Sequence, residues 1–249
     1  MNGSSSLLLL LVTVPATPGS AQQEPPATLY EVHIPGEEPS SIEYSVELSG
    51  VGRRESGTEH NWWSADAATH LRLTDTRGGG RRTRSAWMKR GDQCFFLWQS
   101  YRVDDDQSWE ARRNEATSVS TCGPEDFPVP IGAARRDCTY SGVGVARDQR
   151  FLVYSCPTID EVKFYLDPES MQLKLRTYEL GDGSGLAYRT YSGWLDLGGL
   201  RTAESTVESD RSGRIGTVLL DGPIPASRFD WDEVVRWVEE LDGRFVDDR

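Results

Sequence analysis

The residues that could do chemistry in this 249-residue chain are three histidines, four cysteines and many carboxylates. His33, His60 and His70 do not share the i, i+4 spacing that presents two imidazoles on one helix face. His60, Asp66 and His70 can be grouped as a metal cluster, but such spacing is common by chance, and imidazoles flanking strands explain them better. Asp104–Asp106 is typical of a solvated loop and lacks the ligand spacing of a calcium site. We therefore expect no metal.

Motifs for nucleophilic or nucleotide chemistry are absent from the sequence. No G-x-S-x-G nucleophile elbow occurs, because Asp182 stands where an elbow at Ser184 would need glycine. Phosphate-binding and dinucleotide-binding glycine loops are missing too. Carboxylates are numerous, but no motif arranges them for hydrolysis. The sequence predicts a protein that is not an enzyme and uses no cofactor.

The cysteines indicate structural crosslinks. Cys94, Cys122, Cys138 and Cys156 form an even set without the C-x-x-C pairs of a zinc site. Three pairings are possible. The stretch from Cys138 to Cys156 reads as a hairpin that turns near Arg147, which favours Cys138–Cys156 and leaves Cys94–Cys122 as the second bridge.

Tryptophan is unusually frequent. The eight are Trp62, Trp63, Trp87, Trp98, Trp109, Trp194, Trp231 and Trp237. Such rings suit the core of a pleated sheet, or a groove for a sugar or acyl chain. Trp62 and Trp63 are neighbours, and neighbouring strand residues point to opposite faces. Either both faces of that strand are apolar, or one ring is exposed for a ligand.

The elements that must position these side chains are mostly strands. Apolar and polar residues alternate in Val162–Leu166, Leu173–Arg176 and His70–Leu73, as in strands with one covered face. Turns such as Asp167–Ser170 join neighbouring strands into an antiparallel meander. Cys94–Trp98 is apolar throughout, which predicts a central strand covered on both faces.

Few segments favour a helix. Asp104–Ala116 is charged and is a candidate for a short surface helix. Residues 230–242 are the clear candidate, with Asp230 as a suitable N-cap. The spacing of one buried stripe is followed by Trp231, Val234, Val235, Val238 and Leu241.

The first 21 residues have the pattern of a secretory signal peptide. Leu7–Val14 is an apolar core, shorter than the roughly 20 residues that span a bilayer, and Gly19–Ala21 supplies a small-residue cleavage site. We expect cleavage near Ala21, a linker over 22–28 and a single β-rich domain over 29–249. The prediction is a soluble periplasmic or secreted protein. Its net charge of −12, without a basic run, argues against nucleic acid and anionic membrane surfaces as partners.

Several strand–turn signatures together resemble the outer-membrane lipoprotein carrier (LolA-like) superfamily. In the second half they are Phe164–Glu169, Leu173–Arg176, Tyr191–Trp194, Gly199–Arg201 and Pro225–Phe229. In the first half they are Asn61–Trp63, His70–Leu73 and Trp87–Asp92 leading into Cys94–Trp98. The resemblance covers most of Leu29 to Phe229 and concerns fold more than an exact role.

The resemblance implies a mainly β (α+β) fold: a strongly curved antiparallel sheet, or half-barrel, covered by a few helices. Its concave apolar side would hold a lipid, a lipoprotein acyl group or another hydrophobic ligand, with an envelope protein as a further candidate partner. We expect the cavity to be lined by Trp87, Phe96, Trp98, Phe164, Leu166, Leu173, Leu175, Leu186 and Tyr188. The alternative is a cell-envelope interaction or saccharide-binding module that uses exposed Trp62 and Trp63.

Overall fold

The computed structural model describes residues 24–50, 56–103, 109–114, 120–121, 128–146, 148–157, 162–179, 185–208 and 211–239. The predicted signal peptide over 1–21, the acidic run Asp104–Asp106 and Cys122 lie outside the described residues.

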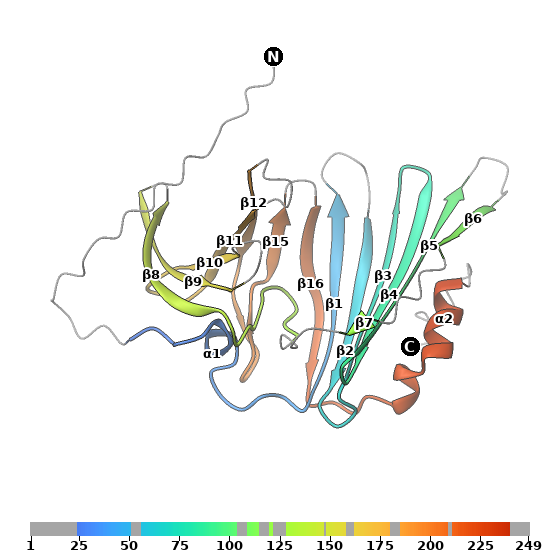
Figure 1. Cartoon of the computed structure of the whole chain (residues 1–249), viewed down its shortest axis with the longest axis horizontal. Helices are drawn as coiled ribbons and strands as arrows, with labels where there is room; N and C mark the ends of the chain where they lie inside the picture. The colour runs from blue at the N-terminus through green and yellow to red at the C-terminus, as the bar shows by residue number, and fades with distance from the viewer. Residues whose placement is uncertain are drawn as a thin grey trace, which may run out of the picture.

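The described chain is built around one antiparallel sheet of 14 strands that is not closed (Figure 1). Its order is β6-β5-β4-β3-β2-β1-β16-β15-β12-β11-β10-β9-β8, with β7 paired to β5. The strands of the first half are β1 Ser41–Gly50, β2 Ser56–Ser64, β3 Thr69–Gly78, β4 Arg81–Arg90, β5 Gln93–Val103, β6 Trp109–Asn114 and β7 Ser120–Thr121. Those of the second half are β8 Thr139–Ala146, β9 Gln149–Ser155, β10 Lys163–Leu166, β11 Leu173–Glu179, β12 Leu186–Ser192, β15 Ser205–Glu208 and β16 Arg211–Leu220. A separate pair consists of β13 Leu195–Asp196 and β14 Arg201–Thr202.

The predicted mainly β, antiparallel architecture is confirmed, but helices contribute less than expected. The described residues hold two α-helices, α1 Leu29–His33 and α2 Trp231–Glu239, and a single 3₁₀ turn, η1 Ala226–Phe229. The expected helix over Asp104–Ala116 is wrong for residues 109–114, which pair with β5 as strand β6, and the rest of that segment lies outside the described residues. A free sheet edge offers backbone partners that outweigh the local preference of a charged segment.

Tight turns set the register of the meander. Gly79 and Gly80 link β3 to β4 with φ of 58° and 72°, and Gly78 pairs with Arg81 directly behind them. Two consecutive positive φ values define the turn that matches strand twist, and glycine adopts them without a steric penalty. The strands fan out from β8 at one end to β6 at the other (Figure 1).

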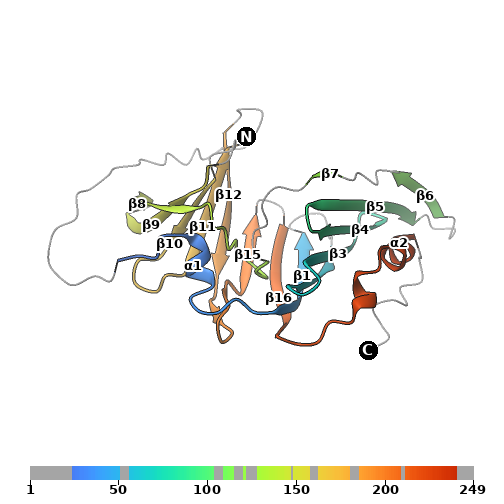
Figure 2. The same cartoon turned by 60° about the horizontal axis from the view of Figure 1, so that its bottom comes forward.

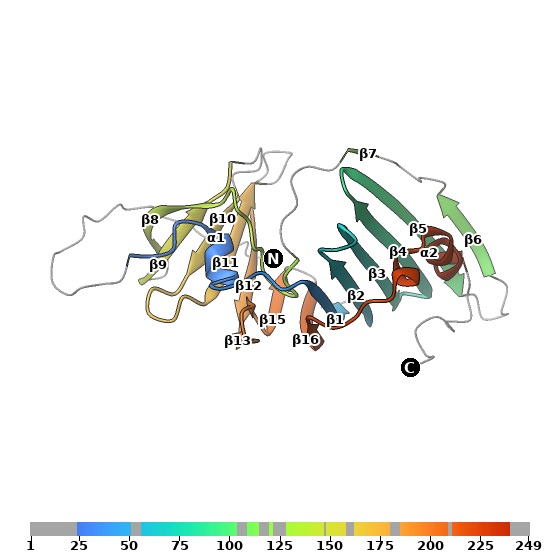
Figure 3. The ribbon, with the colours of Figure 1, turned by 90° about the horizontal axis from the view of Figure 1, so that it is seen from below.

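The two faces of the sheet carry different cores. We call face 1 the side that bears Tyr44, Val46 and Trp87, and face 2 the side that bears Leu71 and Met88; the register of β1 to β5 separates them. On face 1, α1 packs in the α1 core, which includes Leu29, Val32, Ile42, Tyr154, Phe164, Leu166 and Leu173. On face 2, α2 packs in the α2 core, which includes Trp62, Leu71, Leu73, Met88, Leu97, Val234 and Trp237. Figures 2 and 3 show α1 beside the β8–β12 end and α2 beside β3–β5.

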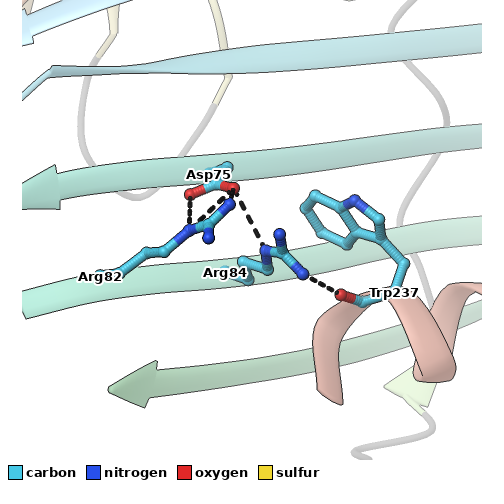
Figure 4. Close-up of polar contacts among 4 residues, drawn as sticks. All are labelled: Asp75, Arg82, Arg84 and Trp237. Atoms are coloured by element: carbon cyan, nitrogen blue, oxygen red, sulfur yellow. Dashed lines mark hydrogen bonds and ion pairs between the residues drawn. The ribbon is translucent and has the colours of Figure 1, made fainter. Parts of the chain in front are cut away.

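Buried arginine holds α2 to the sheet. The side chain of Arg84 is only 1% exposed. Its Nε donates a hydrogen bond to Asp75 Oδ2 at 3.1 Å, and its Nη1 donates one to the Trp237 carbonyl at 2.7 Å (Figure 4). Arg82 also pairs with Asp75. Burial by itself would raise the pKa of Asp75, but the two guanidinium groups outweigh it and lower that pKa. Trp237 lies in the last described turn of α2, so Arg84 ties this part of the helix to the sheet.

The predicted hairpin and one of its crosslinks are confirmed. β8 and β9 pair antiparallel from Thr139 opposite Ser155 to Ala146 opposite Gln149, and Cys138 is bonded to Cys156 just beyond. Cys94 is also disulfide-bonded, while its predicted partner lies outside the described residues.

Candidate functional site

A hollow of about 590 Å³ lies on face 1 between the sheet and the segment 129–132. Its size is within the range of roughly 300–1,000 Å³ that is usual for small-molecule sites. The first half of the sheet and strands β12, β15 and β16 form the floor. We call it the face 1 hollow.

The floor of the face 1 hollow changes from apolar to hydroxyl-rich across the sheet. β1 contributes Tyr44, Val46 and Leu48. The hydroxyl side chains on β3 and β4 are Thr74, Thr76, Thr83 and Ser85. The pairing register explains this order, because Val46 opposes Glu59, Glu59 opposes Thr74, and Thr74 opposes Ser85.

An aromatic row borders the hydroxyl side chains. Trp87 on β4 opposes Phe96 on β5, and both line the hollow. The guanidinium of Arg72 lies 5.4 Å from the centre of a Trp87 ring, which is within cation–π range. The hollow therefore offers both apolar and polar surface to one ligand.

The wall formed by residues 129–132 is anchored from behind. Ile131 N donates to Thr202 Oγ1 at 3.0 Å, and the fully buried Thr202 hydroxyl donates back to the Ile131 carbonyl at 2.7 Å. Gly132 has a φ of +141°, and a Cβ there would lie 2.7 Å from Cε1 of His33. Both the backbone angle and the close imidazole favour glycine at this position.

His33 is a structural residue behind this wall. Its side chain is fully buried, and Nδ1–H donates to the Arg201 carbonyl at 2.6 Å. Burial lowers the pKa of His33 to about 4, more than the carbonyl hydrogen bond raises it. The imidazole is therefore neutral at pH 7.

Charged residues gather at the β12 side of the hollow. Arg189 pairs with Glu208 at 2.6 Å, and the Tyr178 hydroxyl donates to the other Glu208 oxygen at 2.6 Å. Burial by itself would raise the pKa of Glu208, but these hydrogen bonds outweigh it and lower that pKa. Arg176 lies directly opposite Arg189 in the neighbouring strand, on the same face.

The nine predicted lining residues occupy three different environments. Trp87 and Phe96 line the face 1 hollow, and Trp98 lies on the same face of β5. Packed inside the α1 core are Phe164, Leu166 and Leu173, each at most 1% exposed. On face 2 lie Leu175, which packs beside Phe151, Val153 and Tyr165, and the exposed Leu186 and Tyr188.

The exposed tryptophan platform is wrong for Trp62 and Trp63. They are 4% and 7% exposed, Trp62 in the α2 core and Trp63 in the α1 core. The strand has an apolar environment on both faces, which is the other outcome that their adjacency allowed.

Two parts of the site escaped the sequence interpretation. The hydroxyl-bearing positions of β3 and β4 are the polar half of an alternating pattern, which reads as ordinary solvated surface. Val129–Gly132 belongs to no helix or strand, so periodicity gives no signal for it. Arg176 and Arg189 could have indicated a polar site, because each is a charged residue that follows an apolar or aromatic residue within a predicted strand.

Within the described ranges, no group of three or more histidine, cysteine or carboxylate side chains could hold a metal ion. None of the helices in that part of the chain is long and apolar enough to cross a bilayer.

Comparisons with known proteins give likenesses of fold. No family model matches the sequence, and no curated protein matches it. Among solved structures, a DUF1329 family protein from Desulfovibrio piger has a TM-score of 0.48 at 10% identity, covering 82% of this chain and 94% of that one. A LolA superfamily protein from Nitrosomonas europaea has a TM-score of 0.41 at 10% identity, covering 82% and 95%. An outer-membrane lipoprotein-sorting protein domain from Vibrio parahaemolyticus has a TM-score of 0.39 at 10% identity, covering 80% and 92%.

What the site binds must come from the residues of this chain.

Proposed function

We propose that the protein is a non-enzymatic binding protein and that its ligand is an amphiphile, such as a lipid or an acyl group, held in the face 1 hollow. The observation that carries this proposal is the combination of an apolar strip on β1 with hydroxyl and aromatic side chains on β3 to β5 around a single hollow. A wholly apolar ligand would leave the hydroxyl groups without hydrogen bonds, and a sugar would leave the apolar strip uncovered.

The apolar strip supplies the affinity in this account. An acyl chain that lies along Leu48, the partly exposed residue of this strip, removes apolar area from water, whereas Val46, Val129 and Ile131 are already buried and form the floor and wall. The gain is about 25 cal/mol per Å², from which the cost of association is subtracted. Trp87 and Phe96 add aromatic surface at the other side of the floor.

Export is part of the proposal. The Cys138–Cys156 bridge and the bonded state of Cys94 suit an oxidising compartment, such as the periplasm or the extracellular space. A predicted signal peptide before residue 22 points the same way.

Lipid extraction and a binding assay test the proposal together. Protein purified from its native envelope is extracted with organic solvent, and the extract is examined by mass spectrometry. Delipidated protein is then titrated with the neutral fluorescent probe N-phenyl-1-naphthylamine. We expect co-purified lipid and saturable probe binding that weakens in Leu48→Asp, because Leu48 lines the hollow and is only partly buried.

Tyr188→Asp is the matched control, because Tyr188 is 52% exposed and lies on the opposite face. Equal loss of binding in the two variants, or absence of both lipid and probe binding in the parent, would overturn the proposal.

A further inference from the structure

Building on the proposed function, we propose that the ligand is an anionic amphiphile whose carboxylate or phosphate head is held by Arg176 and Arg189, at the β11–β12 side of the face 1 hollow. The chain of the ligand then extends toward the apolar strip on β1. Four independent features of the described residues support this assignment.

The first feature is the local charge. The protein as a whole carries a net charge of −12. The hollow is nevertheless lined by three arginines, Arg72, Arg189 and Arg211, and by two carboxylates, Glu59 and Glu208. Its lining charge is therefore 3 − 2 = +1, in a molecule that otherwise repels anions. A positive concave site with low-dielectric walls concentrates an anionic ligand.

The second feature is the geometry of the arginine pair. Arg176 and Arg189 are direct partners in the register of β11 and β12, so they point to the same face. Side chains at directly opposed positions have Cβ atoms roughly 4.5–5.5 Å apart. Two positive side chains on directly opposed residues repel each other, and an anion between them relieves the repulsion.

The third feature is the shortage of acceptors. Glu208 accepts hydrogen bonds from both Arg189 and Tyr178, so its two oxygens are already engaged. No described carboxylate forms an ion pair with Arg176, whose guanidinium instead lies 5.6 Å from the ring centre of Phe164 and 5.2 Å from that of Tyr178. Among the described residues, Glu208 therefore pairs with Arg189 alone, and Arg176 has no carboxylate partner.

The fourth feature is a pair of buried donors. The Nε atoms of both Arg176 and Arg189 are buried and have no hydrogen-bond partner in the described structure. A buried donor left unsatisfied costs about 1–3 kcal/mol, and more when it is charged. Both atoms belong to directly opposed residues, and the oxygens of a carboxylate or phosphate between these side chains are the acceptors that guanidinium groups bind with directional hydrogen bonds.

A displacement assay with ligands that share one chain tests the head group. Laurate, dodecyl phosphate and 1-dodecanol are compared for their ability to displace N-phenyl-1-naphthylamine from delipidated protein. A charge-assisted hydrogen bond contributes roughly 1.5–3 kcal/mol, and about 1.4 kcal/mol is a tenfold change in affinity. We therefore expect both anions to displace the probe at concentrations at least about tenfold below that of the alcohol.

Variants locate the effect. Arg176→Gln should reduce the advantage of the anions over the alcohol by about tenfold. Arg214→Gln is the matched control, since Arg214 is 69% exposed, pairs with Glu204 and lies on face 2 opposite Glu47. It makes the same change of charge and should leave the preference unaltered. Glu208→Gln removes a negative charge and should increase the preference for the anions over the alcohol. This second variant tests the inference if Arg176→Gln does not fold.

The outcomes separate this inference from the proposed function. If the alcohol and the anions displace the probe equally, the head-group assignment is wrong while amphiphile binding stands. If neither the probe nor any chain binds, the proposed function itself fails. Inorganic phosphate is the control ligand that has a charged group but no alkyl chain. If it displaces the probe at concentrations as low as those of dodecyl phosphate, the site binds anions without needing an amphiphile, and the inference is overturned.

Discussion

Strands β2 to β5 present two faces that the molecule uses in different ways. On face 2, Leu71, Leu73 and Met88 are at most 1% exposed beneath α2. On face 1, the intervening positions carry Arg72, Thr74 and Ser85 and line a hollow. The same alternating sequence therefore builds a closed core on one side and a candidate binding site on the other.

The difference between the two faces shows which face an alternating apolar pattern can identify. Alternation of apolar residues identifies the face that must be covered, and in this protein its own helix α2 covers it. The site lies on the complementary face, where the pattern shows polar residues. A search for a ligand cavity among apolar positions accordingly selects core residues such as Phe164 and Leu173, which are packed against α1.

The largest expected loss of stability comes from a substitution in the α2 core on face 2. Trp237→Ala removes a ring that is 1% exposed in the α2 core. We expect the free energy of unfolding to fall by about 3–5 kcal/mol, the range for deleting a buried aromatic side chain. Chemical denaturation monitored by circular dichroism measures the change. A loss below about 1 kcal/mol would show that α2 contributes little to the closure of face 2.

The next effect concerns the polar anchor of that helix. Arg84→Met should lower the free energy of unfolding by about 3 kcal/mol, because the Trp237 carbonyl loses its donor and Asp75 keeps only Arg82. Arg236→Met is the control, since its side chain is 62% exposed and it pairs with Glu233 on the helix surface.

Acid provides a second readout of the same anchor. The pKa of Asp75 is lowered in the folded protein, so its contribution is present above the unfolded pKa of about 3.9 and is lost as the pH falls through the folded value. The parent should therefore lose more stability than Arg84→Met on going below pH 4. An equal loss in both would contradict the role of Arg84 at Asp75.

Behind face 1, a neutral imidazole predicts a different pH window. The pKa of His33 is lowered to about 4 in the folded protein, whereas an unfolded histidine titrates near 6.5. The unfolded state therefore binds the proton first, and stability that is complete above pH 6.5 declines as the pH falls toward 4. Between pH 7.5 and pH 5 the loss should be about 2 kcal/mol, since one pKa unit is about 1.36 kcal/mol.

His33→Asn removes this titration, so its stability should change less over the same interval than that of the parent. His70 is the control: its pKa is lowered to about 3, by burial first and then by Arg72 and Lys89. His70 therefore also lowers the free energy of unfolding as the pH falls, and this loss remains in His33→Asn. Parallel curves for the parent and His33→Asn would show that His33 is not buried as described.

The smallest stability effect is expected on the open face. Trp87→Ala should lower the free energy of unfolding by only about 1 kcal/mol, because this ring is half-buried beside the hollow. Binding of N-phenyl-1-naphthylamine should weaken clearly in the same variant. A large loss of stability without loss of binding would place Trp87 in the core and outside the site.

The strand meander, the β8–β9 hairpin, the C-terminal helix and the Cys138–Cys156 bridge could be predicted, because each depends on local spacing. Asp230 accepts a hydrogen bond from Asp232 N at 3.0 Å, as suits a residue chosen as N-cap from sequence. The site could be predicted only in Trp87 and Phe96. The Val129–Gly132 wall depends on contacts between segments far apart in the chain, such as Ile131 with Thr202, which periodicity does not encode. The arginine pair depends on the register between β11 and β12, which alternation alone does not specify.

Photocrosslinking tests most directly the claim that face 1 is the binding face. Delipidated protein is loaded with a diazirine-bearing fatty acid, irradiated and digested, and the modified peptides are identified by mass spectrometry. We predict adducts on Tyr44, Val46, Leu48, Ser85, Trp87 or residues 129–132, which line the hollow. Adducts confined to the exposed apolar residues of face 2, which are Leu186, Tyr188, Val207 and Leu219, would contradict the account.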